Sequence, residues 1–312
     1  PNGQATAAAA DYDWKNDKLT ARGGVTLRSD ELQVKAARVQ LFDKMTRAVA
    51  SGDNGVRLTR GAMTAAAERV EVFNIGQKGT LRLKASGGVR YANAPTTVRA
   101  AALEATGVGT GTGKTAAQKI VASDGAQLVS GDLKVSARRV EATSVSGKRV
   151  GAVTATGDVE YSRAGTKVSA GHVQALDLTD SGAGKIIAKN GATLRKDDLT
   201  VTASRVEATN VTSAGAARVV ASGGARARNA DGAASGERVV WAGGKITASG
   251  AVKLEARGNT LRGRELKTDD TFLHATLSGD VSGRLADGST VRAPQVSYDK
   301  KANRIVAEGG VS

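Results

Sequence analysis

Residues 81–91 read LRLKASGGVRY, and this stretch decides the fold class. Its apolar residues alternate with arginine, lysine and serine, so apolar and polar side chains point to opposite faces of an extended chain. Two glycines, Gly87 and Gly88, interrupt the alternation. Glycine inside a strand usually marks a bulge or a sharp bend. The stretch therefore predicts a β-strand that bends at its middle.

Near copies of this stretch recur along the whole chain. They read, for example, TARGGVTL at 20–27, TATGDVEY at 154–161, VASGGARA at 220–227 and TASGAVKL at 247–254. Ten copies follow one another at spacings of 27 to 37 residues, or about 32 on average. A second string lies between them, as in LKVSARRVEA at 133–142 and LTVTASRVEA at 199–208. This period indicates a repeat protein in which each unit packs on its neighbours.

The composition excludes several other classes of protein. The 312 residues include 39 Gly, 3 Pro, 2 Trp, 4 Tyr, 3 Phe and no Cys. Without Cys there is no disulfide framework and no thiolate site, and two His argue against a histidine-rich metal site. No apolar run approaches the roughly 18 residues of a transmembrane helix. The first residues, PNGQATAAAADYD, do not resemble a signal peptide, and we expect that a leader has been cleaved or omitted.

We expect one elongated all-β domain over 1–312, built from about ten repeats and about twenty bent antiparallel strands. Residues 1–10 are expected to be disordered or a linker. A bend at each mid-strand glycine would let a strand start in one sheet and finish in a facing one. The Ala-rich segment AMTAAAERVEV at 62–72 is expected to be a strand despite its helix propensity, because it aligns with strand positions in the other copies.

Two longer stretches carry a resemblance to a known family. RVQLFDKMTRAVASGDNGVRL at 38–58 and APQVSYDKKANRIVAEGGV at 293–311 resemble the OstA-like lipopolysaccharide-transport family, which includes LptA, LptC and the periplasmic domain of LptD. The resemblance extends over essentially all of 11–312. It implies a V-shaped twisted β-jelly roll whose apolar cleft carries lipid acyl chains. The chain has more repeats and fewer bulky residues than is typical of the family, which leaves the identity of the lipid open.

The same resemblance implies a function. It predicts a non-enzymatic carrier or bridge for lipopolysaccharide or another amphipathic lipid in the periplasm, where it functions in outer-membrane biogenesis. It also implies partners: other Lpt-type envelope proteins, or further copies of the chain, joined end to end through edge strands. The alternative is a structural or adhesive β-repeat spacer of the cell envelope without lipid cargo.

Cleft candidates are the inward-pointing apolar residues of the best-formed repeats. They are Leu27, Leu83, Val89, Leu133, Val135, Val159, Leu199 and Val201. Each of them could equally well pack against the facing sheet. A cleft rich in alanine would then be closed and dry.

Other motifs do not predict an enzyme. GVGTGTGKT at 107–115 resembles a phosphate-binding loop, but its glycine spacing departs from the required pattern and it aligns with inter-strand loops. The two His, His172 and His274, lie far apart in the sequence. The acidic pairs at 197–198 and 269–270 fall in or beside predicted turns, where Asp is favoured. Asn210 begins a glycosylation-type triplet, which needs a secretory route that nothing else indicates. We expect no catalytic residue, no cofactor and no metal.

The net charge of +15 has two interpretations. Lys and Arg alternate outward along the strands, where they solvate the faces and protect edges against aggregation. A basic chain also attracts anionic lipid headgroups or envelope polymers. Nucleic-acid binding is disfavoured, because stacking aromatic residues are scarce.

Overall fold

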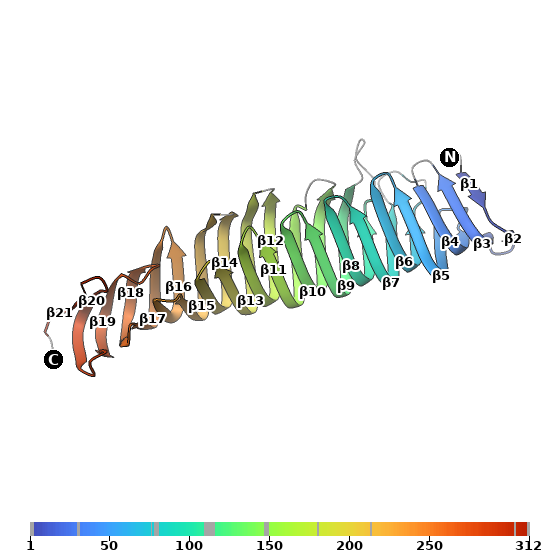
Figure 1. The fold of residues 1–312 in the computed structure, drawn as a ribbon. Coiled ribbons are helices and arrows are strands. Elements are labelled where there is room, and N and C mark those ends of the chain that lie inside the picture. Colours follow the sequence, from blue (N-terminus) through green and yellow to red (C-terminus); the bar gives the residue numbers. More distant parts are fainter. Residues whose placement is uncertain are drawn as a thin grey trace. The chain divides into compact units, whose positions relative to one another are not determined.

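The computed structural model describes residues 3–29, 32–75, 77, 81–108, 116–146, 150–179, 181–212, 214–302 and 304–310. Within these ranges the chain forms 21 β-strands and no helix (Figure 1). The strands are β1 (Gly3–Thr6), β2 (Ala9–Asp13), β3 (Lys18–Ser29), β4 (Leu32–Phe42), β5 (Arg47–Arg60), β6 (Met63–Phe73), β7 (Arg82–Asn93), β8 (Thr96–Thr106), β9 (Ala116–Ser130), β10 (Leu133–Ser146), β11 (Ala152–Arg163), β12 (Thr166–Thr179), β13 (Gly182–Lys196), β14 (Leu199–Thr212), β15 (Gly215–Arg228), β16 (Gly232–Ala242), β17 (Lys245–Ala256), β18 (Asn259–Asp269), β19 (His274–Arg284), β20 (Thr290–Asp299) and β21 (Arg304–Glu308). The expected all-β class is confirmed.

The chain divides into two compact units. Unit 1 comprises Pro1–Val159 and Leu176–Asp180, and unit 2 comprises Glu160–Ala175 and Ser181–Ser312. In unit 1, each strand from β3 to β10 pairs antiparallel with the next. In unit 2, the strands from β13 to β21 do the same. The expectation of a single domain over 1–312 stays a prediction.

The segment 1–10, for which we expected disorder or a linker, contains strand residues. Both β1 and β2 pair antiparallel with β3, β1 with its second half and β2 with its first. Backbone hydrogen bonding to β3 therefore orders the part of this segment that the structure describes. Its alanine-rich sequence gave no alternation from which this pairing could be predicted.

The predicted bend is confirmed at mid-strand. In β7 the register skips from Ser86 to Val89, whereas β8 skips only one residue, Ala101. The skipped Gly87 and Gly88 have φ angles of +80° and +61°, a left-handed conformation that glycine adopts without a Cβ penalty. Two consecutive residues of this kind turn the strand out of the plane of its ladder. We call this arrangement the corner.

Each corner also requires a close approach between neighbouring strands. A Cβ built on Gly223 of β15 would lie 2.8 Å from Cβ of Ser204, which is the skipped residue of β14. In unit 2 the roles are exchanged at β12 and β13, where the glycine is Gly171 and its neighbour is Asn190. Pro294 occupies the skipped position of β20, where no ladder bond needs the N–H that proline lacks.

Each bent strand contributes to two layers. Layer I contains the second halves of odd-numbered strands and the first halves of even-numbered ones, such as residues 25–29 of β3 and 32–36 of β4. Layer II contains the other halves, such as residues 18–22 of β3 and 38–42 of β4. In β7 the same inward parity buries Leu83 and Ala85 in layer II and Val89 and Tyr91 in layer I, each to 4% exposure or less. Burial this deep requires that the two inner faces cover each other.

The corner makes a prediction about two adjacent glycines. Gly224→Ala places a Cβ at φ +67° with nothing within 4 Å, whereas Gly223→Ala at φ +79° also meets Ser204. We expect Gly224→Ala to lower the free energy of unfolding by about 1 kcal/mol and Gly223→Ala by about 2–3 kcal/mol. Chemical denaturation measures both.

A compensating substitution provides the control. Ser204→Gly should restore part of the stability lost in Gly223→Ala, because it reproduces the exchange that the chain makes at Gly171 and Asn190. Equal losses for both glycines, or no rescue, would show that the close approach at the corner does not contribute to stability.

Candidate functional site

An apolar row on the inner face of layer II leads from solvent into the interior of unit 1. The row crosses the strands in register as Tyr12, Leu19, Leu41, Ala48, Val72, Leu83, Ala105 and Ile120. Tyr12 is 39% exposed, Leu19 and Leu41 are half-buried, and Ala48 is already buried. The row therefore opens to solvent at β2 to β4 and closes from β5 onward.

A hollow of about 520 Å³ lies at this opening. It is lined by Tyr12, Trp14, Asp17, Leu19, Leu41, Lys44 and Met45. Trp14 and Met45 are 85% and 57% exposed, which is unusual for large apolar side chains. The hollow thus combines exposed apolar surface with a lysine at its edge.

Turn geometry holds the aromatic side of the hollow in place. The rings of Tyr12 and Trp14 stack edge to face with centroids 4.3 Å apart. The Tyr12 hydroxyl donates a hydrogen bond to Oδ1 of Asp17 at 2.5 Å, and the backbone N–H of Lys44 donates to Oδ2 at 3.0 Å. The Tyr12 hydroxyl, followed by the Lys44 N–H, holds the pKa of Asp17 below its usual range. Asp17 thus links the turn after β2 to the turn after β4.

Seven of the eight cleft candidates from the sequence are buried in the interior, and Leu27 is half-buried. Leu83 belongs to the inner row of layer II. Leu27 and Val135 lie at the two ends of one inner row of layer I, which crosses β3 to β10. Their role in lipid binding stays a prediction.

The hollow at β2 to β4 was missed by the sequence reasoning. A signal for it exists in the sequence YDW at 12–14, because a chain with nine aromatic residues places two of them within three positions. Alternation alone could not show that these rings are exposed. That depends on the strands beside them.

Each layer has one margin at the corners and another margin at the opposite ends of its strands. We call these opposite margins the lips, and contacts join the lip of layer I to the lip of layer II. In unit 1, Nη1 of Arg60 in layer I donates to the backbone oxygen of Val108 in layer II at 3.0 Å. In unit 2, Nδ2 of Asn229 donates to the backbone oxygen of Asp270 at 2.8 Å. An ion pair joins Lys300 to Asp231. These contacts join residues at strand ends and in turns, so they close the interior along the lips.

An aromatic ring reinforces the lip contacts of unit 2. Phe272 is completely buried although it lies in the turn between β18 and β19. A Cβ built on Gly232, the first residue of β16, would lie 3.2 Å from Cβ of Phe272. The ring therefore packs directly against the opposite lip.

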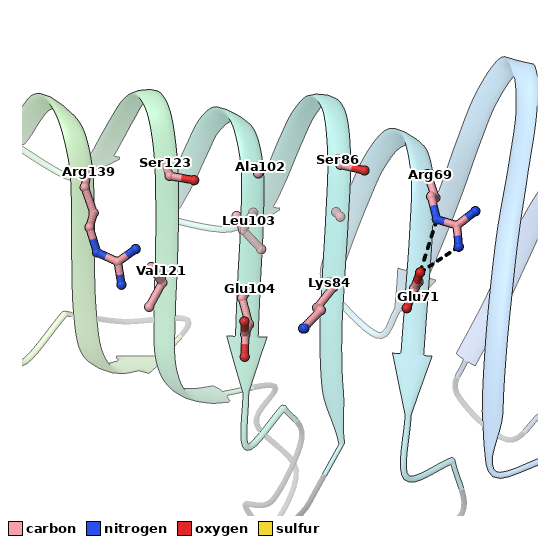
Figure 2. Close-up of a pocket in the computed structure, with 11 residues that line it drawn as sticks. Arg69, Glu71, Lys84, Ser86, Ala102, Leu103, Glu104, Val121, Ser123 and Arg139 are labelled. Carbon is pink, nitrogen blue, oxygen red and sulfur yellow. Dashed lines mark hydrogen bonds and ion pairs between the residues drawn. The ribbon is translucent and has the colours of Figure 1, made fainter.

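The outer face of layer II in unit 1 carries a second hollow, of about 400 Å³. Figure 2 shows Ser86, Ala102 and Ser123 lying between Arg69 and Arg139. These five residues form one cross-strand row over β6 to β10. The hollow exists because Ala102 stands where β6 and β10 carry an arginine.

Ion pairs compensate the cations beside this hollow. Glu71 accepts hydrogen bonds from Nε and Nη2 of Arg69 at 3.1 and 2.7 Å, and Nη2 of Arg47 lies 3.5 Å away. Arg82 pairs with Glu104 at 2.6 Å. The hydrogen bonds from Arg69, together with the charge of Arg47, hold the pKa of Glu71 below its usual range against a smaller effect of burial.

The polar residues that could imitate an active site occupy turns and surfaces. Asp269 accepts backbone hydrogen bonds from Thr271, Leu273 and His274 at 2.9–3.0 Å and so shapes the turn after β18. Burial raises its pKa, but the hydrogen bonds, first that from the Thr271 hydroxyl, outweigh burial and keep the pKa below its usual range. Asp197 lies at φ +52° in the turn after β13.

The remaining motifs give no cluster of reactive groups. His172 lies in β12, and His274 lies 3.5 Å from Asp299 across β19 and β20. Residues 109–115 of the glycine-rich loop lie outside the described residues. Among the residues that the structure describes, no group of three or more His, Asp or Glu could hold a metal ion, and no helix could span a membrane.

Comparisons with known proteins give little support for a relationship. No protein-family model matches the chain, and no curated protein has a significantly similar sequence. Among solved structures, LptH, the LptA-homologous periplasmic component of the lipopolysaccharide transport device from Pseudomonas aeruginosa, matches over 50% of this chain and 82% of its own. The two sequences are 11% identical and the TM-score is 0.23. These values do not establish a family.

The ion pairs of Glu71 predict a dependence of stability on pH. A carboxylate whose pKa is lowered by folding stabilises the protein above its unfolded pKa, near 4.5, and loses this effect as the pH falls through the folded value. Glu71→Gln should lower stability at pH 7 by about 0.3–1 kcal/mol, and this difference should vanish near pH 3. Thermal unfolding between pH 7 and pH 3 measures it, with Glu68→Gln at an exposed corner as the control. A difference that persists at pH 3 contradicts the assignment.

Proposed function

We propose that this protein is a non-enzymatic carrier of an amphipathic lipid, with lipopolysaccharide as the leading candidate. The observation that carries the proposal is the inner apolar row of layer II, which opens to solvent at Tyr12, Leu19 and Leu41 and continues into the interior. An acyl chain gains about 0.8 kcal/mol for each CH₂ group that it buries. A row of apolar side chains running across the strands offers such burial along its whole length.

The hollow at the opening has the chemistry of a lipid inlet. Trp14 and Met45 present exposed apolar surface to an acyl chain. Lys44 lines the same hollow and would pair with a phosphate or carboxylate of the headgroup. An amphipathic ligand would thus satisfy both kinds of side chain at once.

Further along the row the acyl chain would have to separate the lips. In unit 1 the contacts between the lips include the hydrogen bond from Arg60 to Val108. A hydrogen bond of this kind contributes about 1 kcal/mol net, which is close to the gain from burying one CH₂ group. We infer that the cleft is closed at rest and opens locally around a passing chain.

The proposal extends to place and partners. A carrier of this kind belongs in the periplasm or cell envelope, between two membranes. Among the described strands, exposed β2 is paired with β3 alone, and such an edge can pair with a strand of another copy or of another envelope protein. The OstA-like lipopolysaccharide-transport family remains the proposed family.

One observation favours the second candidate, a structural spacer of the envelope. The interior residues Leu83, Val89, Leu133, Val135, Val159 and Val201 are each exposed by 3% or less. An interior that is packed in this way can hold the two layers together without any cargo. The two functions predict opposite results for lipid capture.

A substitution at the inlet separates the two functions. Trp14 is 85% exposed, so Trp14→Ala should leave the melting temperature unchanged within about 1 °C. If the hollow admits lipid, the same variant should bind fluorescent lipopolysaccharide about tenfold more weakly, since a buried aromatic ring contributes on the order of 1.5–3 kcal/mol. Fluorescence titration measures the binding constant.

The matched control is Val129→Ala, which removes another exposed apolar side chain, on the outer face of layer I. Val129→Ala should not alter lipid binding. If wild type binds no lipopolysaccharide, or if both variants bind as wild type does, the spacer is the better assignment and the carrier is wrong.

A cross-link tests whether the lips open. In a chain without Cys, Gly232→Cys with Phe272→Cys places two Cβ atoms a few tenths of an ångström closer than in most disulfides. The oxidised double variant should show at least fivefold less lipid cross-linking to a photoreactive residue at Val201, which lies two strands from Gly232 in layer I. Reduction of the same double variant should restore it, so the comparison is made within one protein. Undiminished cross-linking after oxidation would show that lipid does not pass between these lips.

A further inference from the structure

On the outer face of layer I in unit 1, the charged residues of two described cross-strand rows are all cations. Two cross-strand rows run in register over the eight strands β3 to β10. The first is Thr26, Lys35, Arg57, Ala66, Arg90, Arg99, Gln127 and Ser136, and the second is Arg28, Gln33, Thr59, Thr64, Ala92, Thr97, Val129 and Lys134. These sixteen positions hold six cations and no carboxylate. All six cations are exposed.

The outer face of layer II in the same strands is different. Its two corresponding rows are Thr20, Gln40, Val49, Glu71, Lys84, Glu104, Val121 and Glu141, and Arg22, Arg38, Ser51, Arg69, Ser86, Ala102, Ser123 and Arg139. They hold five cations and three carboxylates, and these carboxylates pair with Arg69 and with Arg47, Arg82 and Lys119 of the next row on the same face. On the outer face of layer II, carboxylates therefore lie among the cations and pair with several of them, whereas the sixteen positions of layer I hold no carboxylate.

The uncompensated cations on layer I also lie directly opposite one another. Lys35 faces Arg57 across β4 and β5, and Arg90 faces Arg99 across β7 and β8. Like charges at directly opposed positions destabilise a sheet. Among the described residues, these four cations make no ion pair. Their repulsion is thus left for an external anion to relieve.

In unit 2 a carboxylate of the chain itself relieves a repulsion of this kind. On the outer face of layer I there, Lys253 faces Arg262 across β17 and β18. Glu255 lies on the same face and pairs with both Lys253 and Arg226. No carboxylate takes this place among the sixteen positions of unit 1.

We propose that the outer face of layer I in unit 1 binds a linear anionic polysaccharide that carries carboxylate or phosphate groups. The arginines offer planar donor pairs that match such groups. Thr59, Thr64 and Thr97 lie in the row beside them and supply hydroxyls for the hydroxyl groups of sugars. The row runs across the strands, so a chain lying along it meets Lys35 and Arg57, then Arg90 and Arg99.

Other anionic partners fit this face less well. Single-stranded nucleic acid is bound with stacking aromatic residues, and the sixteen positions hold none. An anionic bilayer is usually engaged with apolar or aromatic side chains that insert beside the cations, and Val129 is the only large apolar side chain of the two rows. A hydrated sugar chain requires neither.

The test uses a fluorescein-labelled oligomer of alginate, a linear polyuronate, and the full chain. Wild type should bind the oligomer, with an affinity that falls as salt rises. The double variant Arg57→Thr with Arg99→Thr should weaken binding about 25-fold, or about fivefold for each cation lost, and should lower the salt slope by about 2. Fluorescence anisotropy measures both.

The matched control removes the same charge from layer II. Arg38→Thr with Arg139→Thr also lowers the net charge by two, and it should change binding less than threefold. Equal weakening by the two pairs would overturn the site, because net charge alone would then explain binding. Absence of alginate binding by wild type would also overturn it, as would tighter binding to a DNA duplex or to phosphatidylglycerol vesicles than to alginate.

A single substitution separates the binding role from a role in folding. Arg99→Glu places a carboxylate opposite Arg90 and so supplies within the face a partner for a cation, as Glu255 does for Lys253 and Arg226 in unit 2. This variant should melt at a higher temperature than wild type and yet bind alginate at least 25-fold more weakly. A variant that melts lower, or that keeps wild-type binding, contradicts the proposal. Neither outcome depends on lipid binding at the inlet.

Discussion

The corner is the constraint on which the rest of the structure depends. Two consecutive left-handed residues turn most odd-numbered strands, β5 instead has a four-residue skip that ends at Gly55, and one skipped residue turns the even-numbered strands. Left-handed backbone costs an ordinary residue roughly 1–2 kcal/mol, so glycine, aspartate or asparagine fills most of these positions. Because the corners are aligned from strand to strand within each unit, the halves on either side of them form two layers in each unit. The inner rows, the outer rows and the lips all take their places from this alignment.

Much of the fold could be predicted from the sequence, because its determinants are local. Alternation in LRLKASGGVRY shows which residues are buried, and the glycines show where the strand bends. The segment 62–72 forms β6 although three successive alanines favour a helix. Pairing with β5 and β7 outweighs that propensity, because all three alanines pair with β5 and because Ala65 and Ala67 are buried in the interior. The pairing of β1 and β2 could not be predicted, since those residues carry no alternation.

The candidate sites depend on which residues meet across strands, and a single sequence does not contain that information. Lys35 and Arg57 are 22 positions apart, and only the register places them opposite each other. Each cation points outward, as alternation predicts. In unit 1 the carboxylates pair with cations of layer II and not with those in the two rows of layer I. This difference could not be predicted from the sequence, because the two halves of each strand belong to different layers. The inlet at Trp14 and the burial of Phe272 in a turn likewise result from contacts between distant segments.

Two kinds of corner alternate along the chain, and this fixes the unit in which such a protein can change its length. A two-residue corner in one strand lies beside a one-residue corner in the next strand, as Gly223 lies beside Ser204. Gain or loss of one strand would place two corners of the same kind side by side and reverse the direction of every strand that follows. Gain or loss of two strands, about 32 residues, keeps every neighbour matched. Duplication in evolution could therefore lengthen the chain only in whole pairs of strands, which is the period that its sequence still displays.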